Sequence, residues 1–127
     1  MERHHEQRLH SRFDCAGSAL AYFVPGEPPV TSRIVDLSVR GCLMVLENAR
    51  ITSRGTALEL AFTVNHLDFR VRAQVRSIRS LTTLGLVFDC VHERVKPYLE
   101  ELIEELAADD QKRRVPKLML PNKRWGL

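Results

Sequence analysis

The sequence lacks the features that mark several large classes of protein. Its three cysteines, Cys15, Cys42 and Cys90, stand singly, without a C-x-x-C pair or a Cys/His cluster. This pattern argues against a disulfide framework and predicts small buried thiols in a reducing compartment. No apolar run approaches the roughly 18–20 residues that span a bilayer. The N-terminus is charged, with no hydrophobic segment behind it, so we expect no signal peptide and a cytoplasmic location.

Patterns for catalysis and for metal binding are also missing. The chain has no nucleophile elbow, no histidine-containing triad signature and no P-loop, so we expect that it is not an enzyme. His4, His5 and His10 lie in a polar stretch without a cysteine or carboxylate partner in fixed geometry. A protein metal site needs a convergent set of ligands, so we expect no metal here.

What the chain does contain is enough apolar sequence for one domain, together with an excess of arginine. Its length of 127 residues fits a single domain, and a hydrophobic share of 44% allows a core. The formal net charge is +3, and arginine outnumbers lysine. Arginine suits planar, bidentate recognition of phosphate, although ordinary surface charge is the alternative for most of these side chains.

Short apolar or alternating segments, separated by polar turns, predict six strands. We expect them over residues 13–24, 30–37, 42–46, 56–64, 67–78 and 83–90. In the fourth segment Leu58, Leu60 and Phe62 alternate with more polar residues, which is the period of a half-buried strand. About six strands at such short spacing favour an antiparallel barrel or sandwich.

After the last strand the period of the apolar residues changes to that of a helix. Val95, Leu99, Leu102 and Leu106 recur on one helical face. Pro97 is tolerated only in a first turn, so we expect the helix to begin at residues 93–96. A lone amphipathic helix must bury its apolar stripe, so it is expected to pack against the strands.

The two ends of the chain differ from its centre. Residues 1–12 are polar without periodicity and predict a flexible arm, whereas residues 13–108 form the predicted strands and helix. From Asp109 the chain becomes polar and then basic. Pro116 and Pro121 are expected to interrupt any helix there, so residues 109–127 are interpreted as a mobile basic tail.

Two short motifs carry the residue types that an anionic, guanine-containing ligand requires. The first is Arg8-Leu-His-Ser-Arg12, or R-x-x-x-R, in the arm. Guanidinium groups match phosphate oxygens and the O6/N7 edge of guanine. Taken alone, this motif is equally explained as a solvated basic terminus.

The second motif is Asp36-Leu-Ser-Val-Arg-Gly41, or D-x-S-x-x-G. A carboxylate accepts hydrogen bonds from the N1–H and N2 amino group of guanine, and a serine hydroxyl can serve the same edge. Asp36 and Ser38 are two residues apart, so on a strand they would share a face, and Gly41 allows positive φ or close approach of a ligand. Alone, this motif is also explained as a polar turn.

In this order and spacing, R-x-x-x-R followed by D-x-S-x-x-G resembles the PilZ domain family, whose members are bacterial receptors for the second messenger cyclic di-GMP. The resemblance covers roughly residues 3–106 and extends to the strand ending Gly85-Leu-Val-Phe88. It implies a mainly β fold: a six-stranded antiparallel β-barrel with a C-terminal α-helix and a flexible N-terminal arm.

The resemblance also implies a role for each motif residue. Arg8 and Arg12 would hold phosphate and the Hoogsteen edge of guanine, while Asp36 and Ser38 would contact a guanine from the barrel. Gly41 would allow close approach of the chain. The ligand would be cyclic di-GMP with no other cofactor, and closure of the arm would be read by a downstream protein partner.

One position departs from the family pattern. Many members carry an additional arginine directly before R-x-x-x-R, at a position associated with binding a stacked ligand dimer. This chain has Gln7 there. The number of ligand molecules bound is therefore left open.

Two other functions remain as alternatives. Arg70, Arg72 and Arg76 lie on one face of a predicted strand, which would suit a basic barrel that binds nucleic acid. Such binders stack bases on aromatic side chains, and only 6% of this chain is aromatic, so a nucleic-acid polymer is the less favoured ligand. The other alternative is a PilZ-like interaction module without ligand binding, although such members usually lack the motif residues present here.

Overall fold

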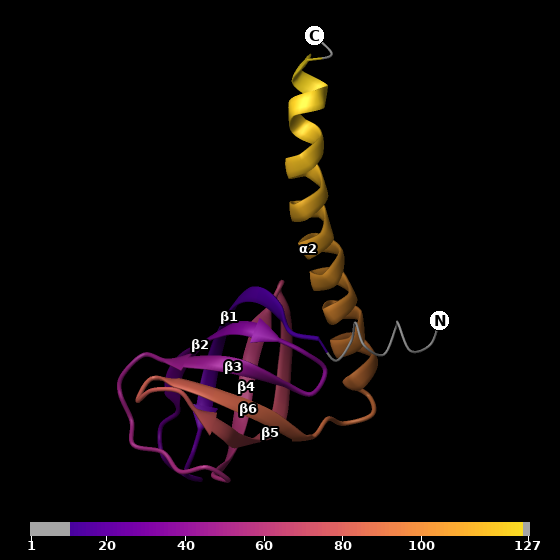
Figure 1. The fold of residues 1–127 in the computed structure, drawn as a ribbon. Coiled ribbons are helices and arrows are strands. Elements are labelled where there is room, and N and C mark those ends of the chain that lie inside the picture. The colour runs from indigo at the N-terminus through magenta and orange to yellow at the C-terminus, as the bar shows by residue number, and fades with distance from the viewer. Residues whose placement is uncertain (1–10, 126–127) are drawn as a thin grey trace.

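A closed antiparallel β-barrel forms the body of the protein (Figure 1). The computed structural model describes residues 11–125, and their side chains as far as Lys112. Within that range the elements are β1 (Phe13–Tyr22), β2 (Val30–Leu37), β3 (Gly41–Leu46), β4 (Ala57–Val64), β5 (Leu67–Ile78), β6 (Thr83–Cys90) and α2 (Lys96–Trp125). The strand order is β1-β2-β3-β6-β5-β4, and pairing of β1 with β4 closes the barrel. The predicted six-stranded barrel with a C-terminal helix is confirmed for these residues.

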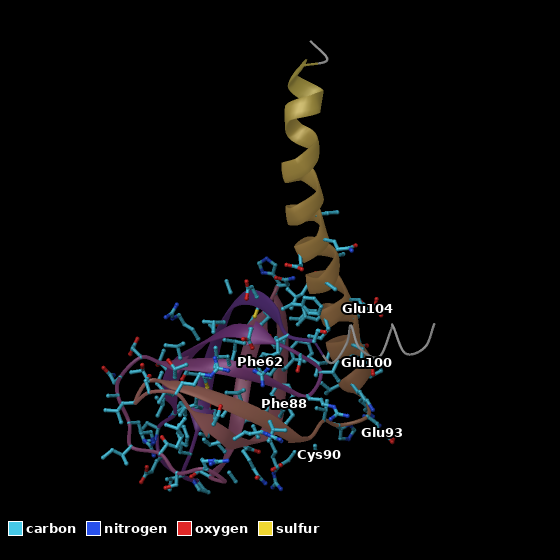
Figure 2. All side chains as sticks on the ribbon, in the orientation of Figure 1. Phe62, Phe88, Cys90, Glu93, Glu100 and Glu104 are labelled. Atoms are coloured by element: carbon cyan, nitrogen blue, oxygen red, sulfur yellow. The ribbon has the colours of Figure 1, made fainter. Side chains whose placement is uncertain are left out.

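The barrel interior is filled by the apolar residues that the alternating patterns predicted. In β4, Leu58, Leu60 and Phe62 are all buried. The Phe62 ring stacks on Phe69 of β5 and Phe88 of β6, with centroids 5.2 and 6.1 Å apart (Figure 2). Inward side chains therefore pack the barrel solid, and the outward positions are left to form surfaces.

The first half of α2 packs on the barrel and completes its core. The buried stripe of this helix contains the expected leucines and two further residues: Leu99, Leu102, Ile103, Leu106 and Ala107. The helix begins at Lys96, as the position of Pro97 predicted, and it lies beside β1. The stripe removes apolar surface from water, which is the main force that holds α2 in place.

Beyond its packed half, α2 extends away from the barrel as a rod (Figure 1). The expectation that Pro116 and Pro121 interrupt the helix was wrong, because α2 continues to Trp125. An interior proline removes one backbone hydrogen bond and its ring presses on the carbonyl four residues earlier, a cost of about 3 kcal/mol. Most of the residues from Ala107 to Arg114 are good helix formers and favour the helix as far as the prolines, and it continues through both positions despite this cost. In the described part of the chain, no helix is long and apolar enough to cross a membrane.

The packing of α2 gives a direct test of its role in stability. Ile103 is fully buried, so we expect Ile103→Ala to lower the free energy of unfolding by about 2–5 kcal/mol in chemical denaturation. Tyr98→Ala is the matched control on the same helix, because the Tyr98 side chain is 61% exposed. Equal effects of the two substitutions would show that α2 does not belong to the core.

Candidate functional site

A register shift in β2 places Asp36 on the outside of the barrel. Along β2, Ser32 and Ile34 point inward and are buried, so regular alternation would bury Asp36 next. Between Ile34 and Asp36, however, the pairing with β3 slips by one residue, and Leu37 takes the buried position instead. A β-bulge re-aims the side chains that follow it. The shift therefore buries a leucine where regular alternation would bury a carboxylate, and a buried carboxylate would be costly.

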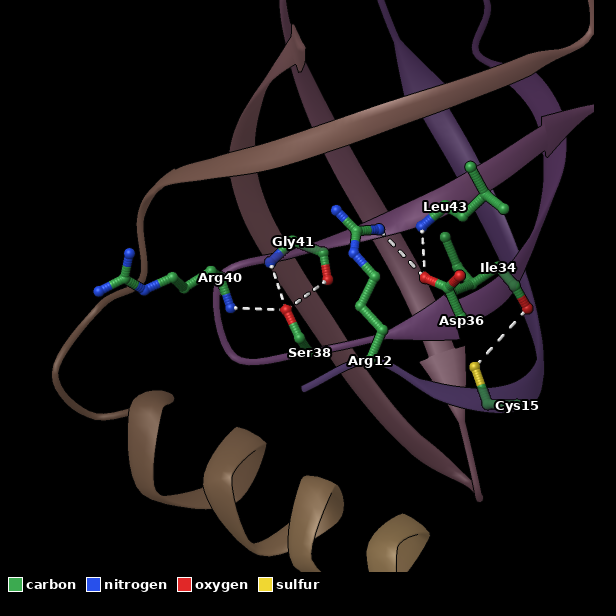
Figure 3. Close-up of polar contacts among 8 residues, drawn as sticks. All are labelled: Arg12, Cys15, Ile34, Asp36, Ser38, Arg40, Gly41 and Leu43. Carbon is green, nitrogen blue, oxygen red and sulfur yellow. Dashed lines mark hydrogen bonds and ion pairs between the residues drawn. The ribbon is translucent and has the colours of Figure 1, made fainter. Parts of the chain in front are cut away.

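Two donors hold the Asp36 carboxylate from different directions (Figure 3). The Arg12 guanidinium donates from Nη1 to Oδ1 over 3.1 Å, and the Leu43 backbone N–H donates to the same Oδ1 over 3.1 Å. The Arg12 and Asp36 side chains are 41% and 21% exposed. Both hydrogen bonds from the described residues go to Oδ1, so Oδ2 is the carboxylate oxygen that can accept from a ligand.

The two motifs of the sequence therefore meet at one point of the barrel. Arg12 directly precedes β1, and Asp36 ends the outward-facing part of β2, 24 residues later. Arg8 lies outside the described residues. The prediction of a mobile arm over residues 1–12 stays a prediction for most of this segment, and at its end Arg12 contacts the barrel.

Ser38 lies in a different place from the one its spacing predicted. We expected Asp36 and Ser38 to share a strand face, but β2 ends at Leu37 and Ser38 lies in the turn that follows. Its side chain is 2% exposed, and its hydroxyl accepts from the N–H groups of Arg40 and Gly41 at 3.1 and 3.2 Å. The same hydroxyl lies 3.3 Å from the Gly41 carbonyl, to which it donates. Ser38 thus builds the β2–β3 turn, which is the polar-turn alternative for this half of the motif.

Gly41 allows a close approach between strands rather than a positive φ. Its φ is not among the positive values of the described glycines, which occur at Gly26 and Gly55. A Cβ on Gly41 would collide with the Leu86 carbonyl oxygen of β6, because β3 and β6 pair at this point. The Arg40 carbonyl also accepts from the Phe88 N–H at 2.7 Å. The turn after Asp36 is thereby fixed to the neighbouring strand β6.

Burial and nearby carboxylates keep the thiol beside Asp36 protonated. Desolvation, with smaller contributions from Asp36 and Asp14, raises the pKa of Cys15 to about 11. Its Sγ lies 3.7 Å from the Ile34 carbonyl oxygen, as a weak donor (Figure 3). Burial also raises the pKa of Cys42, which is fully buried as predicted. These two thiols act as packing groups at the edge of the site, whereas the described Cys90 is exposed, contrary to expectation.

The arginine-rich face of β5 is less basic than its sequence indicated. Arg70 donates to the Glu59 carboxylate over 3.3 Å and lies over the Tyr22 ring at 5.1 Å. Glu59 is also the register partner of Arg72 across the β4–β5 ladder. In the described part of the chain, no group of three or more His, Cys, Asp or Glu side chains could hold a metal ion.

The site combines a cation and a carboxylate acceptor on a rigid barrel edge. Sequence reasoning found Arg12 and Asp36, but it missed the Leu43 N–H that fixes the carboxylate and the bulge that turns it outward. Neither has a signal in the residue types, because any residue can supply a backbone N–H and the bulge contains no glycine. The arrangement suits a ligand that offers donors to Asp36 and acceptors to Arg12.

A comparison with family models matches residues 6–105 to the family described as the PilZ domain. Among curated protein sequences, none matches the chain.

Several solved structures share its fold. The PilZ domain of YcgR from Escherichia coli with c-di-GMP is 19% identical, with a TM-score of 0.61, over 82% of this chain and 94% of that one. The PilZ domain of CeSA from a cellulose-synthesizing bacterium is 14% identical, with a TM-score of 0.61, over 76% of this chain and 97% of that one. YcgR in complex with c-di-GMP is 20% identical, with a TM-score of 0.67, over 82% of this chain and 47% of that one.

The hydrogen bonds of Ser38 predict a stability defect when its hydroxyl is removed. Ser38→Ala leaves the buried N–H groups of Arg40 and Gly41 without their acceptor, so we expect a loss of about 1–3 kcal/mol in the free energy of unfolding. Arg40→Ala is the control, because the exposed Arg40 side chain extends away from Asp36 (Figure 3), and surface changes are usually within about 0.5 kcal/mol. A Ser38→Ala protein as stable as this control would contradict the role of Ser38 in the turn.

The raised pKa of Cys15 predicts a dependence of stability on alkaline pH. The unfolded thiol ionises near its ordinary pKa of 9.0, whereas the folded thiol keeps its proton up to about 11. The contribution of the Cys15 thiol to the free energy of unfolding is therefore fully present below pH 9, and it is lost as the pH rises toward 11. We expect the difference in unfolding free energy between wild type and Cys15→Ala to shrink over this interval. A constant difference would contradict the burial of the thiol.

Proposed function

The chain belongs to the PilZ domain family, and on that premise we propose that it is a non-catalytic bacterial receptor for cyclic di-GMP. The observation that carries the proposal is the 3.1 Å contact between Arg12 and Asp36. It brings together one residue of each motif, at a point where a ligand can reach both. Neighbouring structures of YcgR and of PlzA from Borreliella burgdorferi hold c-di-GMP on the same fold, which supports the choice of ligand.

In the proposed complex Asp36 reads a guanine base. Its free Oδ2 accepts hydrogen bonds from the N1–H and N2 amino group, while the Leu43 N–H keeps Oδ1 in place. A carboxylate that is already held by the backbone needs little reordering when the ligand arrives. Ser38 and Gly41 act indirectly, because they form the turn that sets the position of Asp36.

Arg12 can leave Asp36 at small cost when the ligand binds. An exposed ion pair stabilises a protein by about 0–1 kcal/mol, whereas each charge-assisted hydrogen bond to a ligand contributes roughly 1.5–3 kcal/mol. The Arg12 guanidinium therefore gains by turning to the phosphate or the O6/N7 edge of guanine. We assign the same kind of contact to Arg8, which precedes it in the arm, and the number of ligand molecules depends on this segment.

Movement of Arg12 supplies the signal. The chain enters β1 directly after Arg12, so a change in its contact with Asp36 moves the arm relative to the barrel. The altered surface would then be read by a downstream protein partner. Nothing in this scheme requires a covalent step, which agrees with a receptor rather than an enzyme.

Calorimetric titration with cyclic di-GMP tests the proposal. We expect wild-type protein to bind, and Arg12→Ala and Asp36→Ala each to weaken binding about tenfold or more, since 1.4 kcal/mol corresponds to a factor of ten. Arg76→Ala is the matched control, because this exposed arginine lies on β5 away from the site.

Three results would overturn the proposal. They are a wild-type titration without heat at tens of micromolar ligand, equal affinities of wild type and Asp36→Ala, and a loss of affinity in Arg76→Ala as large as that in Arg12→Ala. Salt-dependent binding to oligonucleotides, with no preference for the cyclic dinucleotide, would instead identify a nucleic-acid-binding barrel.

A further inference from the structure

A groove opens on the outer wall of the barrel next to Asp36. It has a volume of about 630 Å³ and runs between the first half of β1, the middle of β2 and the β4–β5 turn. Pockets of small-molecule ligands have volumes of about 300–1,000 Å³. The lining combines apolar and polar groups, and the residues used below are Ala16, Gly17, Arg33, Val35, Thr63 and His66.

The groove exists because the barrel wall is irregular at this point. Pairing between β1 and β4 begins only at Ser18 and Thr63, so the earlier part of β1 has no partner on that side. Pairing between β1 and β2 is itself interrupted between Asp14 and Gly17. Two interruptions in one short stretch leave the wall open and place backbone polar groups at the floor of the groove.

The floor of the groove is made of very small side chains. Ala16 and Gly17 follow one another along β1, so no bulky group stands above the backbone. At Gly17 the space that a Cβ would take is already filled by Val64, the Thr63 carbonyl oxygen and Ile34, so this glycine serves the packing of the wall. The part of the floor that faces outward is the exposed Ala16, and its methyl group is small enough for a flat molecule to lie against it.

The rim of the groove contains a tight turn. Asn65 and His66 both have positive φ, 51° and 67°, in the two-residue connection between β4 and β5. This is the type I′ geometry of short hairpins, in which Asn is a favoured first residue and glycine the usual second one. Histidine at the second position therefore adds a side chain where glycine would have none, and it lines the groove.

The groove is continuous with the site at Asp36. Val35, which lines it, directly precedes Asp36, and the lining thiol of Cys15 is close enough for Asp36 to contribute to its raised pKa. A ligand that contacts Asp36 with one end can therefore reach the groove with the other. Cyclic di-GMP has two guanine bases, so one base can lie at Asp36 and the other in the adjacent groove.

We propose that the groove receives one guanine base of cyclic di-GMP while Asp36 holds the other. This inference rests on the proposed function. The base lies on the Ala16–Gly17 segment, the Arg33 guanidinium donates to its O6/N7 edge, and the His66 ring stacks on it or meets its edge. Arg33 and His66 are both exposed, so their side chains can adjust to the ligand.

Two substitutions test this assignment without damaging the fold. His66→Gly removes the ring and relieves the positive φ, so we expect a thermal midpoint equal to or above that of wild type. Arg33→Ala changes only an exposed side chain. Each variant should lose about tenfold in affinity for cyclic di-GMP by calorimetry, and Arg76→Ala again serves as the control. Unchanged affinity in both variants would overturn the assignment.

Backbone NMR of the wild-type protein separates this inference from the proposed function. Amide shifts are followed with cyclic di-GMP, with GMP and with ribose 5-phosphate. We expect cyclic di-GMP to move Leu43, Gly17 and Thr63 together, and GMP at higher concentration to move Gly17 and Thr63. Ribose 5-phosphate should leave the groove unchanged.

Every other pattern of shifts overturns the groove assignment, the receptor function or both. Shifts at Leu43 without shifts in the groove would overturn the groove and leave the receptor function standing. Groove shifts with GMP, in a protein that does not bind cyclic di-GMP, would support a guanine site and overturn the receptor function. Equal groove shifts with ribose 5-phosphate would identify a phosphate site and overturn the base assignment, and no shifts with any compound would overturn both claims.

Discussion

The site depends on the one-residue register shift in β2. Regular alternation would carry Asp36 into a core that has no partner for a charge, and it would leave Leu37 in water. The shift reverses both assignments, so the hydrophobic effect that buries Leu37 is also what fixes Asp36 outside. Ser38 and Gly41 then lock the following turn to the barrel wall. Core packing and the exposure of Asp36, the proposed ligand acceptor, are therefore set by the same constraint.

The ion pair of Arg12 and Asp36 connects this rigid element to the segment that enters β1. Its charges are partly exposed, so the pair contributes little to stability and can be replaced at small cost. In the proposed receptor, the ligand exchanges this one weak contact for several stronger ones, and the position of Arg12 changes with it.

The sequence predicted the barrel well because its strands obey simple alternation. Leu60 and Phe62 are buried as expected, and α2 buries Leu102 on the predicted stripe. The site was less predictable. Motif spacing identified Asp36, but it placed Ser38 on a strand face, because the end of β2 at Leu37 is set by the turn hydrogen bonds of Ser38 and not by alternation. The continuation of α2 through Pro116 and Pro121 was not predicted either, because the cost of an interior proline favours a break at each of them.

The central proposal is that Asp36 is the fixed acceptor for a guanine base of cyclic di-GMP. A crystal structure of the protein with this ligand bound tests it most directly. We expect a base whose N1–H and N2 amino group donate to the Asp36 carboxylate, with the Leu43 N–H bond kept and the Arg12 guanidinium turned from Asp36 onto the ligand. A ligand held elsewhere, for example on the Arg70 face of β5, with the Arg12–Asp36 pair unchanged, would contradict it.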